Sequence, residues 1–328
     1  MKILICGGAG YIGSHITKYS LAHGHDVIVI DNLATGHLQS VGPASFHQGN
    51  VGDRDFLEPL LHEQQFDLVM HFCAFSLVGE SVQAPALYYN NNVWQTLTLL
   101  DVMQETGHNN LVFSSTAAVY GTPETEAITE DHPKKPINPY GRSKWMIEQI
   151  LQDYATAYGF NSVCLRYFNA AGADPSGSIG EKHNPETQVI PNILKSVASG
   201  GQMQLKVFGT DYPTPDGSCV RDYIHVNDLA SAHLLAGEYL QNNPGAHAFN
   251  LGIGKGFSVL EVIKAAEDIT GTKLNYDICD RRPGDPPTLI ADSRKAKSVL
   301  GWTPEYMNVE GIIETAWKWH KNGEQFNS

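Results

Sequence analysis

The chain has 328 residues, of which 35 are acidic and 22 are basic, so its formal net charge at pH 7 is −13. Because 42% of the residues are hydrophobic and only 17% are charged, the chain can bury a large core, which excludes disorder as its main state. The acidic balance leaves no broad cationic face, so neither nucleic acid nor an anionic membrane surface is an expected partner. One or two local arginines would still be enough to bind a small anion.

The cysteines and the start of the chain indicate a cytoplasmic protein. The chain begins with a strand-like run at 2–6 rather than with a charged segment followed by an apolar one, so no secretory signal is expected. The longest apolar stretch, 68–78, is too short to span a bilayer. The cysteines are odd in number, widely spaced and outside any CxxC pattern, which predicts reduced and mostly buried thiols in a reducing compartment. They are Cys6, Cys73, Cys164, Cys219 and Cys279.

The first half of the chain alternates short apolar runs with longer helical patterns. Continuous apolar strands separated by helices are typical of a parallel sheet covered on both faces. The pattern therefore predicts a doubly wound α/β fold (Rossmann), with ligands beyond the carboxyl ends of the strands. Strands are predicted at 2–6, 26–31, 67–75, 110–116 and 162–169, and helices at 11–23, 85–105 and 139–158.

Beyond Asn169 the composition becomes rich in Gly, Pro, Ser and Asp, and the regular elements become shorter. This change predicts a first domain over 1–170 and a smaller α/β domain over 171–328, with interleaving of their segments left open.

A glycine-rich turn follows the first predicted strand and leads into a helix. Gly7, Gly10 and Gly13 would let the backbone turn tightly and bring its N–H groups against a pyrophosphate at the helix N-terminus. Asp31 ends the second predicted strand, 18 residues after Gly13, where a carboxylate accepts from a ribose 2′-OH. No Arg or Lys follows at 32–36 to receive a 2′-phosphate, so the pattern favours NAD over NADP.

A tyrosine and a lysine open the helix predicted at 139–158. Tyr140 and Lys144 are four residues apart and therefore share one helix face. A phenol with an ordinary pKa of about 10 needs its anion stabilised by about 4 kcal/mol to act as a base near neutral pH. One ammonium at close range supplies on the order of 4 kcal/mol. Thr116, at the serine-rich end of the strand predicted at 110–116, is the candidate to pass a substrate proton to Tyr140.

These segments together resemble the extended short-chain dehydrogenase/reductase superfamily and, within it, the UDP-glucose 4-epimerase (UDP-galactose 4-epimerase) family. The likeness extends nearly from end to end and is most specific in YPTPDG, VRDYIHVNDLA and RRPGDPP. It implies an NAD-binding Rossmann domain followed by a UDP-sugar-binding domain. It also implies reversible C4 epimerisation of UDP-glucose and UDP-galactose through a 4-keto intermediate, with tightly bound NAD and a place in galactose metabolism.

The resemblance also implies roles for individual residues. Tyr140 would be the catalytic base, with Thr116 and Lys144 as its catalytic partners. The UDP-hexose would contact Thr116, Tyr140, Asn169, Phe208, Arg221, Arg282 and Asp285. NAD would be held by Gly7, Gly10, Tyr11, Ile12, Gly13, Asp31, Asn32, Asn50, Val51, Phe72, Ala74, Asn91, Ser114, Tyr140, Lys144 and Tyr167.

Several positions depart from the family pattern. Ser76 stands where relatives often have Lys, Asn50 where they often have Asp beside the adenine, and Trp94-Gln95 where they often have Asn-Gly. Leu289 stands where relatives carry Tyr or a smaller residue that limits the 2-substituent of the sugar. Leu is shorter than Tyr, so an N-acetyl sugar is an open alternative substrate.

Other functions remain as alternatives. A UDP-glucuronate epimerase or decarboxylase stays open from spacing alone, as does a non-catalytic NAD sensor. A 4,6-dehydratase would place Asp-Glu after the strand-end threonine, where this chain has Ala117-Ala118. No HExxH or Cys/His cluster is present, so no catalytic metal is expected. Family resemblance suggests a homodimer packed through the helices that contain 88–104 and 140–157.

Overall fold

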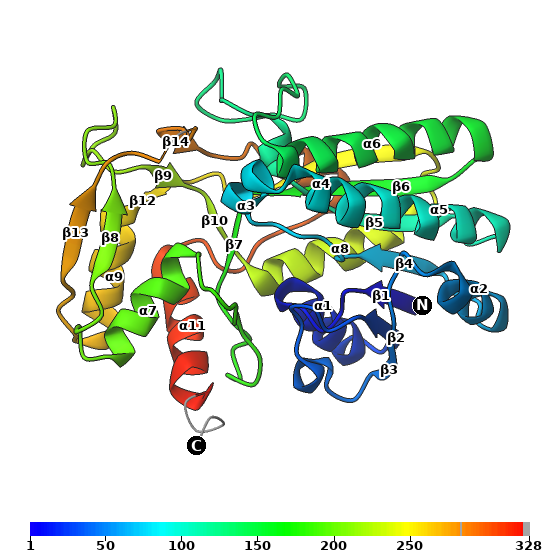
Figure 1. Ribbon diagram of the computed structural model, residues 1–328, viewed down its shortest axis with the longest axis horizontal. Helices are drawn as coiled ribbons and strands as arrows, with labels where there is room; N and C mark the ends of the chain where they lie inside the picture. The colour runs from blue at the N-terminus through cyan, green and yellow to red at the C-terminus, as the bar shows by residue number, and fades with distance from the viewer. Residues whose placement is uncertain (283, 324–328) are drawn as a thin grey trace.

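The computed structural model describes residues 1–282 and 284–323, so Pro283 of the RRPGDPP motif and the last residues of the second predicted domain lie outside it. A seven-stranded sheet forms the larger lobe (Figure 1). Its strand order is β11-β6-β5-β4-β1-β2-β3, and every neighbouring pair is parallel. The strands are β1 (Lys2–Cys6), β2 (Asp26–Asp31), β3 (Ser45–Gln48), β4 (Leu68–His71), β5 (Asn110–Thr116), β6 (Asn161–Tyr167) and β11 (Ala246–Leu251).

Helices cover both faces of this sheet because its strands are apolar on both sides. Alternate residues of β1 enter different cores: Ile3 and Ile5 join one, and Leu4 and Cys6 join the other. This alternation follows from the two-residue period of a strand. The first face is covered by α1 (Tyr11–Ala22), α8 (Val226–Leu240) and α10 (Arg294–Leu300), and the second by α2 (Arg54–Glu63), α5 (Gln95–Glu105) and α6 (Pro139–Tyr158). The predicted doubly wound fold is confirmed.

Three predicted elements differ in extent. The strand predicted at 67–75 ends at His71, because the chain leaves the sheet there to pass close to Gly7. The strand predicted at 162–169 ends at Tyr167, and the next residues form β7 (Asn169–Ala171), which pairs with β10 (Tyr223–His225). The helix predicted at 85–105 is divided into α4 (Pro85–Tyr88), a π-helical segment (Tyr89–Trp94) and α5.

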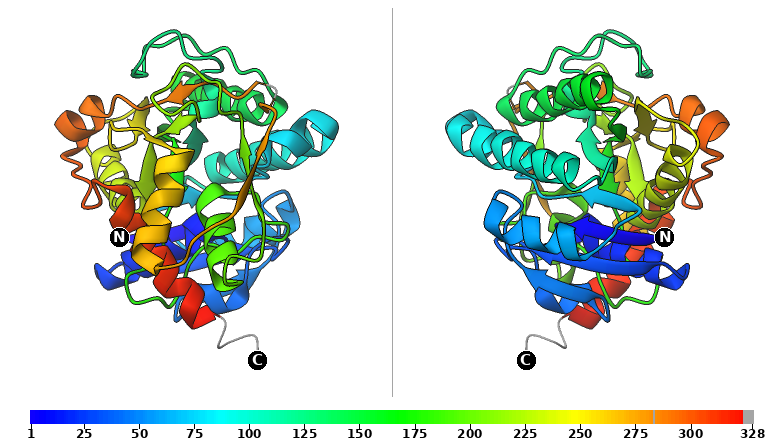
Figure 2. Two further views of the ribbon diagram at one scale, coloured as in Figure 1. Left: turned by 90° about the vertical axis from the view of Figure 1, so that its left-hand side faces the viewer. Right: turned by 90° about the vertical axis from the view of Figure 1, so that its right-hand side faces the viewer.

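A smaller lobe lies beside the carboxyl ends of the strands, and its helices face the viewer in the left view of Figure 2. Its own core contains Leu194, Val262 and Ile312. Its helices are α7 (Val189–Ala198), α9 (Val259–Thr270) and α11 (Val309–Gly323). Its strands are β8 (Leu205–Phe208) with β13 (Tyr276–Cys279), and β9 (Val220–Arg221) with β12 (Phe257–Ser258) and β14 (Thr288–Leu289).

The two lobes are not two consecutive segments of the chain. After the first segments of the smaller lobe, the chain returns to the larger lobe: α8 packs on the seven-stranded sheet and β11 joins it. Both elements lie beyond the boundary expected at 170–171. Residues 226–251 and α10 pack with the first lobe, so the segments of the two lobes interleave, as the expected division left open. Among the described residues, no helix combines the length and the apolar character that a membrane span requires. All five cysteines are free thiols.

Candidate active site

The turn between β1 and α1 leaves no room for side chains at its glycines. Gly7 has a φ of +85°, and a Cβ there would lie 2.9 Å from the carbonyl carbon of Phe72. A Cβ on Gly13 would lie 2.2 Å from the carbonyl oxygen of Gly7. The N-cap of α1 is Gly10, which has no side chain to cap the helix, so the first N–H groups can bind an anion. The turn therefore fits the pyrophosphate of a dinucleotide.

The first turn of α1 also holds the second half of the chain in place. The Tyr11 hydroxyl donates a hydrogen bond to the Gly172 carbonyl over 2.7 Å. About two turns further on, the Lys18 ammonium forms an ion pair with Asp174 at 2.5 Å. Ile12 packs against the core of the sheet. Tyr11 and Lys18 thus connect α1 to the segment after β7.

Asp31 is placed at the end of β2, beside the glycine-rich turn. Its Oδ2 accepts from the Ala9 N–H at 3.0 Å and its Oδ1 from the Leu33 N–H at 2.8 Å. Each carboxylate oxygen keeps a second lone pair, so the group can still accept from a ribose hydroxyl. The next residue, Asn32, is exposed, and its Oδ1 accepts from the Ala34 N–H at 2.9 Å.

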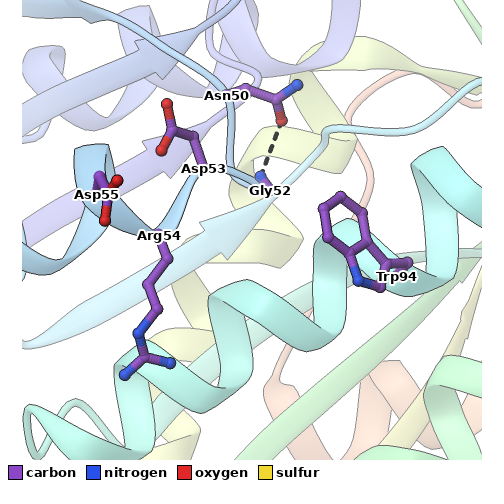
Figure 3. A pocket seen from close by; sticks show the side chains of 6 residues that line it. All are labelled: Asn50, Gly52, Asp53, Arg54, Asp55 and Trp94. Carbon is purple, nitrogen blue, oxygen red and sulfur yellow. Dashed lines mark hydrogen bonds between the residues drawn. The ribbon is translucent and has the colours of Figure 1, made fainter.

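An open cleft of about 430 Å³ lies beyond β3, lined by Asn50, Gly52, Asp53, Arg54, Asp55 and Trp94 (Figure 3). The Asn50 Oδ1 accepts from the Gly52 N–H at 2.8 Å, so the amide NH₂ is the part that can donate to a ligand. Trp94 is 56% exposed and lies on the far side of Gly52 from Arg54 (Figure 3). Val51 next to Asn50 is buried. Two of the positions at which this chain departs from the family pattern, 50 and 94, therefore line the same cleft.

The segment after β4 passes close to the glycine-rich turn and is held by an asparagine that sequence reasoning missed. Phe72 stacks at a tilt on His233, with ring centroids 5.0 Å apart, and Ala74 is partly buried. Asn92 is fully buried; its Oδ1 accepts from the Phe75 N–H and its Nδ2 donates to the Phe75 carbonyl. Asn91 donates to the same Asn92 Oδ1 at 2.9 Å. A run of three asparagines inside an apolar helix was the available signal.

The N-terminus of α6 packs directly on the end of β5, which brings Tyr140 to Thr116. The Asn138 side chain caps α6 by accepting from the Gly141 N–H at 2.8 Å. A Cβ on Gly141 would lie 2.5 Å from the Ala118 carbonyl oxygen, so glycine is required for this approach. The Tyr140 phenol is half-buried and lies beside the Thr116 side chain. Burial raises the pKa of Tyr140, and the nearby Thr116 hydroxyl lowers it by less.

Lys144 is buried one turn further along α6, with 2% of its surface exposed. Its Nζ donates to the Ser114 carbonyl at 2.7 Å and lies 4.6 Å from the centroid of the Phe113 ring. Burial lowers the pKa of Lys144 to about 7. The lowering of the Tyr140 pKa by this lysine stays a prediction. In this structure the Lys144 Nζ is directed at β5, and burial holds the pKa of Tyr140 above its ordinary value.

A buried ion pair, which the sequence did not reveal, fixes α6 against the sheet. The Arg166 guanidinium on β6 donates to both carboxylate oxygens of Glu148, and their side chains are 4% and 5% exposed. Ser115 donates to the same carboxylate. Glu148 follows Lys144 by one helical turn, so this pair helps to set the orientation of the Tyr140–Lys144 face. Tyr167, on the same strand as Arg166, is buried, and its hydroxyl is hydrogen-bonded to His233.

The residues expected to bind the sugar nucleotide form two pairs in the smaller lobe. The Arg221 guanidinium is paired with the Asp285 carboxylate and also donates to the Val220 carbonyl at 2.7 Å. The exposed Arg282 guanidinium lies 4.0 Å from the centroid of the Phe208 ring. An arginine and an aromatic ring stacked in this way can bind a phosphate and a flat base side by side.

Two residues connect these pairs to the Tyr140 region. Asn169 is the first residue of β7. Its N–H donates at 3.0 Å to the carbonyl of Asp222, the residue that follows Arg221. Leu289 on β14 lies opposite Arg221 on β9 and packs on a cluster that contains Ala117 and Phe168. Position 289 thus lies between the arginine and the residue that follows Thr116.

The glycine-rich turn, the strand-end aspartate and the Tyr140–Thr116 contact define a dinucleotide-dependent α/β enzyme with an attached substrate lobe. A family model described as "NAD dependent epimerase/dehydratase family" matches residues 3–252. The chain belongs to this family.

Known relatives are similar over nearly the whole chain. The UDP-glucose 4-epimerase of Lacticaseibacillus casei is 50% identical over 323 residues, which are 98% of this chain and 97% of that protein. A crystal structure described as a UDP-glucose 4-epimerase has a TM-score of 0.96 and 47% identity, covering 99% of this chain and 98% of the other. The UDP-glucose 4-epimerase of Bifidobacterium longum, solved in complex with NAD+ and UDP, has a TM-score of 0.93 and 39% identity, covering 99% of both chains.

Proposed function

We propose that this chain is an NAD-dependent isomerase that interconverts UDP-glucose and UDP-galactose by inverting C4 of the hexose. The observation that carries the proposal is the placement of Tyr140 beside Thr116 at the end of β5, two strands from β1 and its glycine-rich turn, in a chain 50% identical to a UDP-glucose 4-epimerase. Activities on UDP-N-acetylglucosamine or UDP-glucuronate, left open by the sequence, are not favoured by these relatives.

The residues around the turn fit NAD. Gly7 and Gly13 leave space that a Cβ would fill, and the uncapped N-terminus of α1 can bind the pyrophosphate. Asp31 has no cationic neighbour at 32–36 to receive a 2′-phosphate. When bound, NAD would accept the hydride that leaves C4 and would then donate it to the opposite face of the sugar.

The chain's own residues then manage the proton and the substrate. Thr116 hydrogen-bonds the 4-OH, and Tyr140 receives its proton and later returns it. Because burial raises the pKa of Tyr140, the phenolate needs a nearby positive charge, which Lys144 supplies in its protonated form. Holding the hydroxyl and the base within one hydrogen-bonded group provides much of the rate enhancement.

The substrate lobe is proposed to hold the UDP moiety. Arg221 and Arg282 would pair with the diphosphate, Phe208 would stack on the uracil, Asp285 would contact the ribose and Asn169 would bind the sugar nucleotide. If most of the binding energy falls on UDP, the hexose is free to turn over between the two hydride transfers. This division explains why the arginines lie in the smaller lobe and the Tyr140–Thr116 contact in the larger one.

The assembly and location belong to the same proposal. Trp94 and Met146 are 56% and 38% exposed, and they lie on the two segments expected to form a homodimer, 88–104 and 140–157. Exposed apolar side chains on adjacent helices favour a protein–protein contact. Five free thiols favour a reducing cytoplasm. Light scattering on the purified protein measures the assembly, and a monomer at micromolar concentration would contradict the dimer.

The test of function is incubation of the purified protein with UDP-galactose and no added nucleotide. We expect UDP-glucose to form until equilibrium, and NAD to be released when the protein is denatured. Tyr140→Phe should retain NAD and UDP binding and lose nearly all turnover. No epimerisation by the NAD-loaded wild type, or a turnover rate of Tyr140→Phe like that of the wild type, would contradict the proposal.

A further inference from the structure

Three side chains between β7 and α7 form a compact cluster of nitrogen and oxygen ligands that the proposed reaction does not use. Glu181, His183 and Glu186 each offer one ligand atom, and these atoms lie within 4.8 Å of one another. The Nδ1 of His183 lies 3.3 Å from the Glu181 carboxylate and 3.7 Å from the Glu186 carboxylate. All three therefore converge on the same side of the imidazole.

The two carboxylates of the cluster are buried, the His183 side chain is 34% exposed, and the carboxylates outnumber the imidazole. Glu181 is 9% exposed, and the side chain of Glu186 is 3% exposed. In the part of the chain that the structure describes, the Glu186 Oε2 has no hydrogen-bond partner. Two carboxylates and one imidazolium carry a net charge of about −1, and Lys195 is the further cation that acts on Glu181. A buried, unsatisfied carboxylate oxygen is costly unless a cation or a donor reaches it.

The cluster lies beside the first turn of α1. The rings of Tyr11 and His183 meet edge to face, with centroids 6.4 Å apart. Burial and, to a lesser degree, the two carboxylates raise the pKa of the Tyr11 phenol. Tyr11 itself is bonded to the Gly172 carbonyl. A cation at the cluster would therefore fasten the loop of residues 172–188 beneath the glycine-rich turn.

We propose that Glu181, His183 and Glu186 form a structural binding site for a first-row divalent cation such as zinc. One imidazole nitrogen with two carboxylate oxygens is a ligand set that Zn²⁺, Co²⁺ and Mn²⁺ accept, with water completing the coordination. A dication would neutralise the two carboxylates and give the unpartnered Glu186 oxygen a ligand. Its role would be to hold the loop, because the cluster contains no group that contacts the Tyr140 region.

A proton on the His183 imidazole competes with a metal ion for this site. Without a metal ion, the two carboxylates stabilise the imidazolium and raise the pKa of His183 to about 10. The same three residues then form an ion-paired clamp. Metal binding displaces that proton, so the affinity for zinc should increase from pH 6 to pH 8.

The test is a calorimetric titration of the NAD-loaded protein with Zn²⁺ after dialysis against a chelator. His183→Gln and Glu186→Gln remove one ligand each. His62→Gln is the matched control, because His62 lies 3.9 Å from Glu58 on an exposed helix face. We expect one zinc per chain in the wild type and in the control, and an affinity reduced about 10- to 100-fold in the two cluster variants.

Two further readouts complete the test. Unchanged NAD content and circular dichroism show that the variants are folded, and Co²⁺ gives a visible absorption band only when protein ligands replace water. Neither readout requires epimerase activity, so failure of this inference is separate from failure of the proposed function. Absence of zinc uptake by the wild type, or equal zinc affinity in the wild type and His183→Gln, would overturn it.

Discussion

Replacing Lys144 with methionine should stabilise the folded protein most at neutral and acidic pH. Burial lowers the pKa of Lys144 from 10.5 to about 7. At 1.36 kcal/mol per pKa unit, the free energy of binding this proton is about 5 kcal/mol less favourable in the folded protein than in the unfolded chain. Methionine has a similar length and no charge, so the variant avoids this cost while it keeps most of the packing.

The sign of the pH dependence follows from proton binding in the two states. Between pH 7 and pH 10.5 the unfolded chain keeps the Lys144 proton while the folded chain releases it, so the unfolded chain binds more protons. Stability of the wild type therefore rises with pH through this window, and the cost of burying the charge is fully present below pH 7. The stability advantage of Lys144→Met should fall by about 4 kcal/mol between pH 6 and pH 10.

Equilibrium unfolding in urea, followed by tryptophan fluorescence at five pH values from 6 to 10, measures this difference. Lys264→Met is the matched control, because Lys264 is 63% exposed and paired with Asp268 on α9; its effect should stay within about 1 kcal/mol at every pH. Weaker NAD binding by Lys144→Met would lower the free energy of unfolding of this variant equally at every pH, without changing its dependence on pH. A difference between Lys144→Met and the wild type that is constant from pH 6 to pH 10 would refute a lowered pKa of Lys144.

Three further substitutions test the geometry of the site. Gly13→Ala places a Cβ 2.2 Å from a backbone oxygen and should abolish NAD retention. Gly79→Ala is the control and should retain NAD, because no atom lies within 4 Å of its added Cβ. NAD released on denaturation measures both variants, and normal retention in Gly13→Ala would contradict the tight turn. Glu148→Gln leaves the buried guanidinium on β6 without its anion and should cost about 3–5 kcal/mol in urea unfolding; a cost below about 1 kcal/mol would show that the pair is unimportant. Thr116→Val removes the nearby hydroxyl that lowers the pKa of Tyr140, so turnover at pH 7 should fall about 100-fold and the pH–rate profile should move to higher pH. An unchanged profile would exclude this contact.

The larger lobe was predictable to the extent that its signals are local. Apolar runs, helix starts and the glycine-rich turn each depend on residues that are neighbours in sequence. The predicted strands at 2–6, 26–31 and 110–116 therefore match β1, β2 and β5 in their bounds. By contrast, β3 at 45–48 has little apolar character, and β11 joins the sheet only by pairing with β6. Pairing between distant segments leaves no periodic signal in either of them.

The amino-acid sequence by itself determined that Tyr140 and Lys144 share a helix face, because a four-residue spacing fixes that relation in any α-helix. It also determined the glycine-rich turn, because a Cβ at Gly7 or Gly13 would collide with neighbouring backbone atoms. The tertiary structure alone decided what these groups face. Lys144 is buried against β5, and Arg221 is paired with Asp285, 64 residues away. Charge, pKa and pairing depend on burial and on partners from other segments, which only the folded chain brings together.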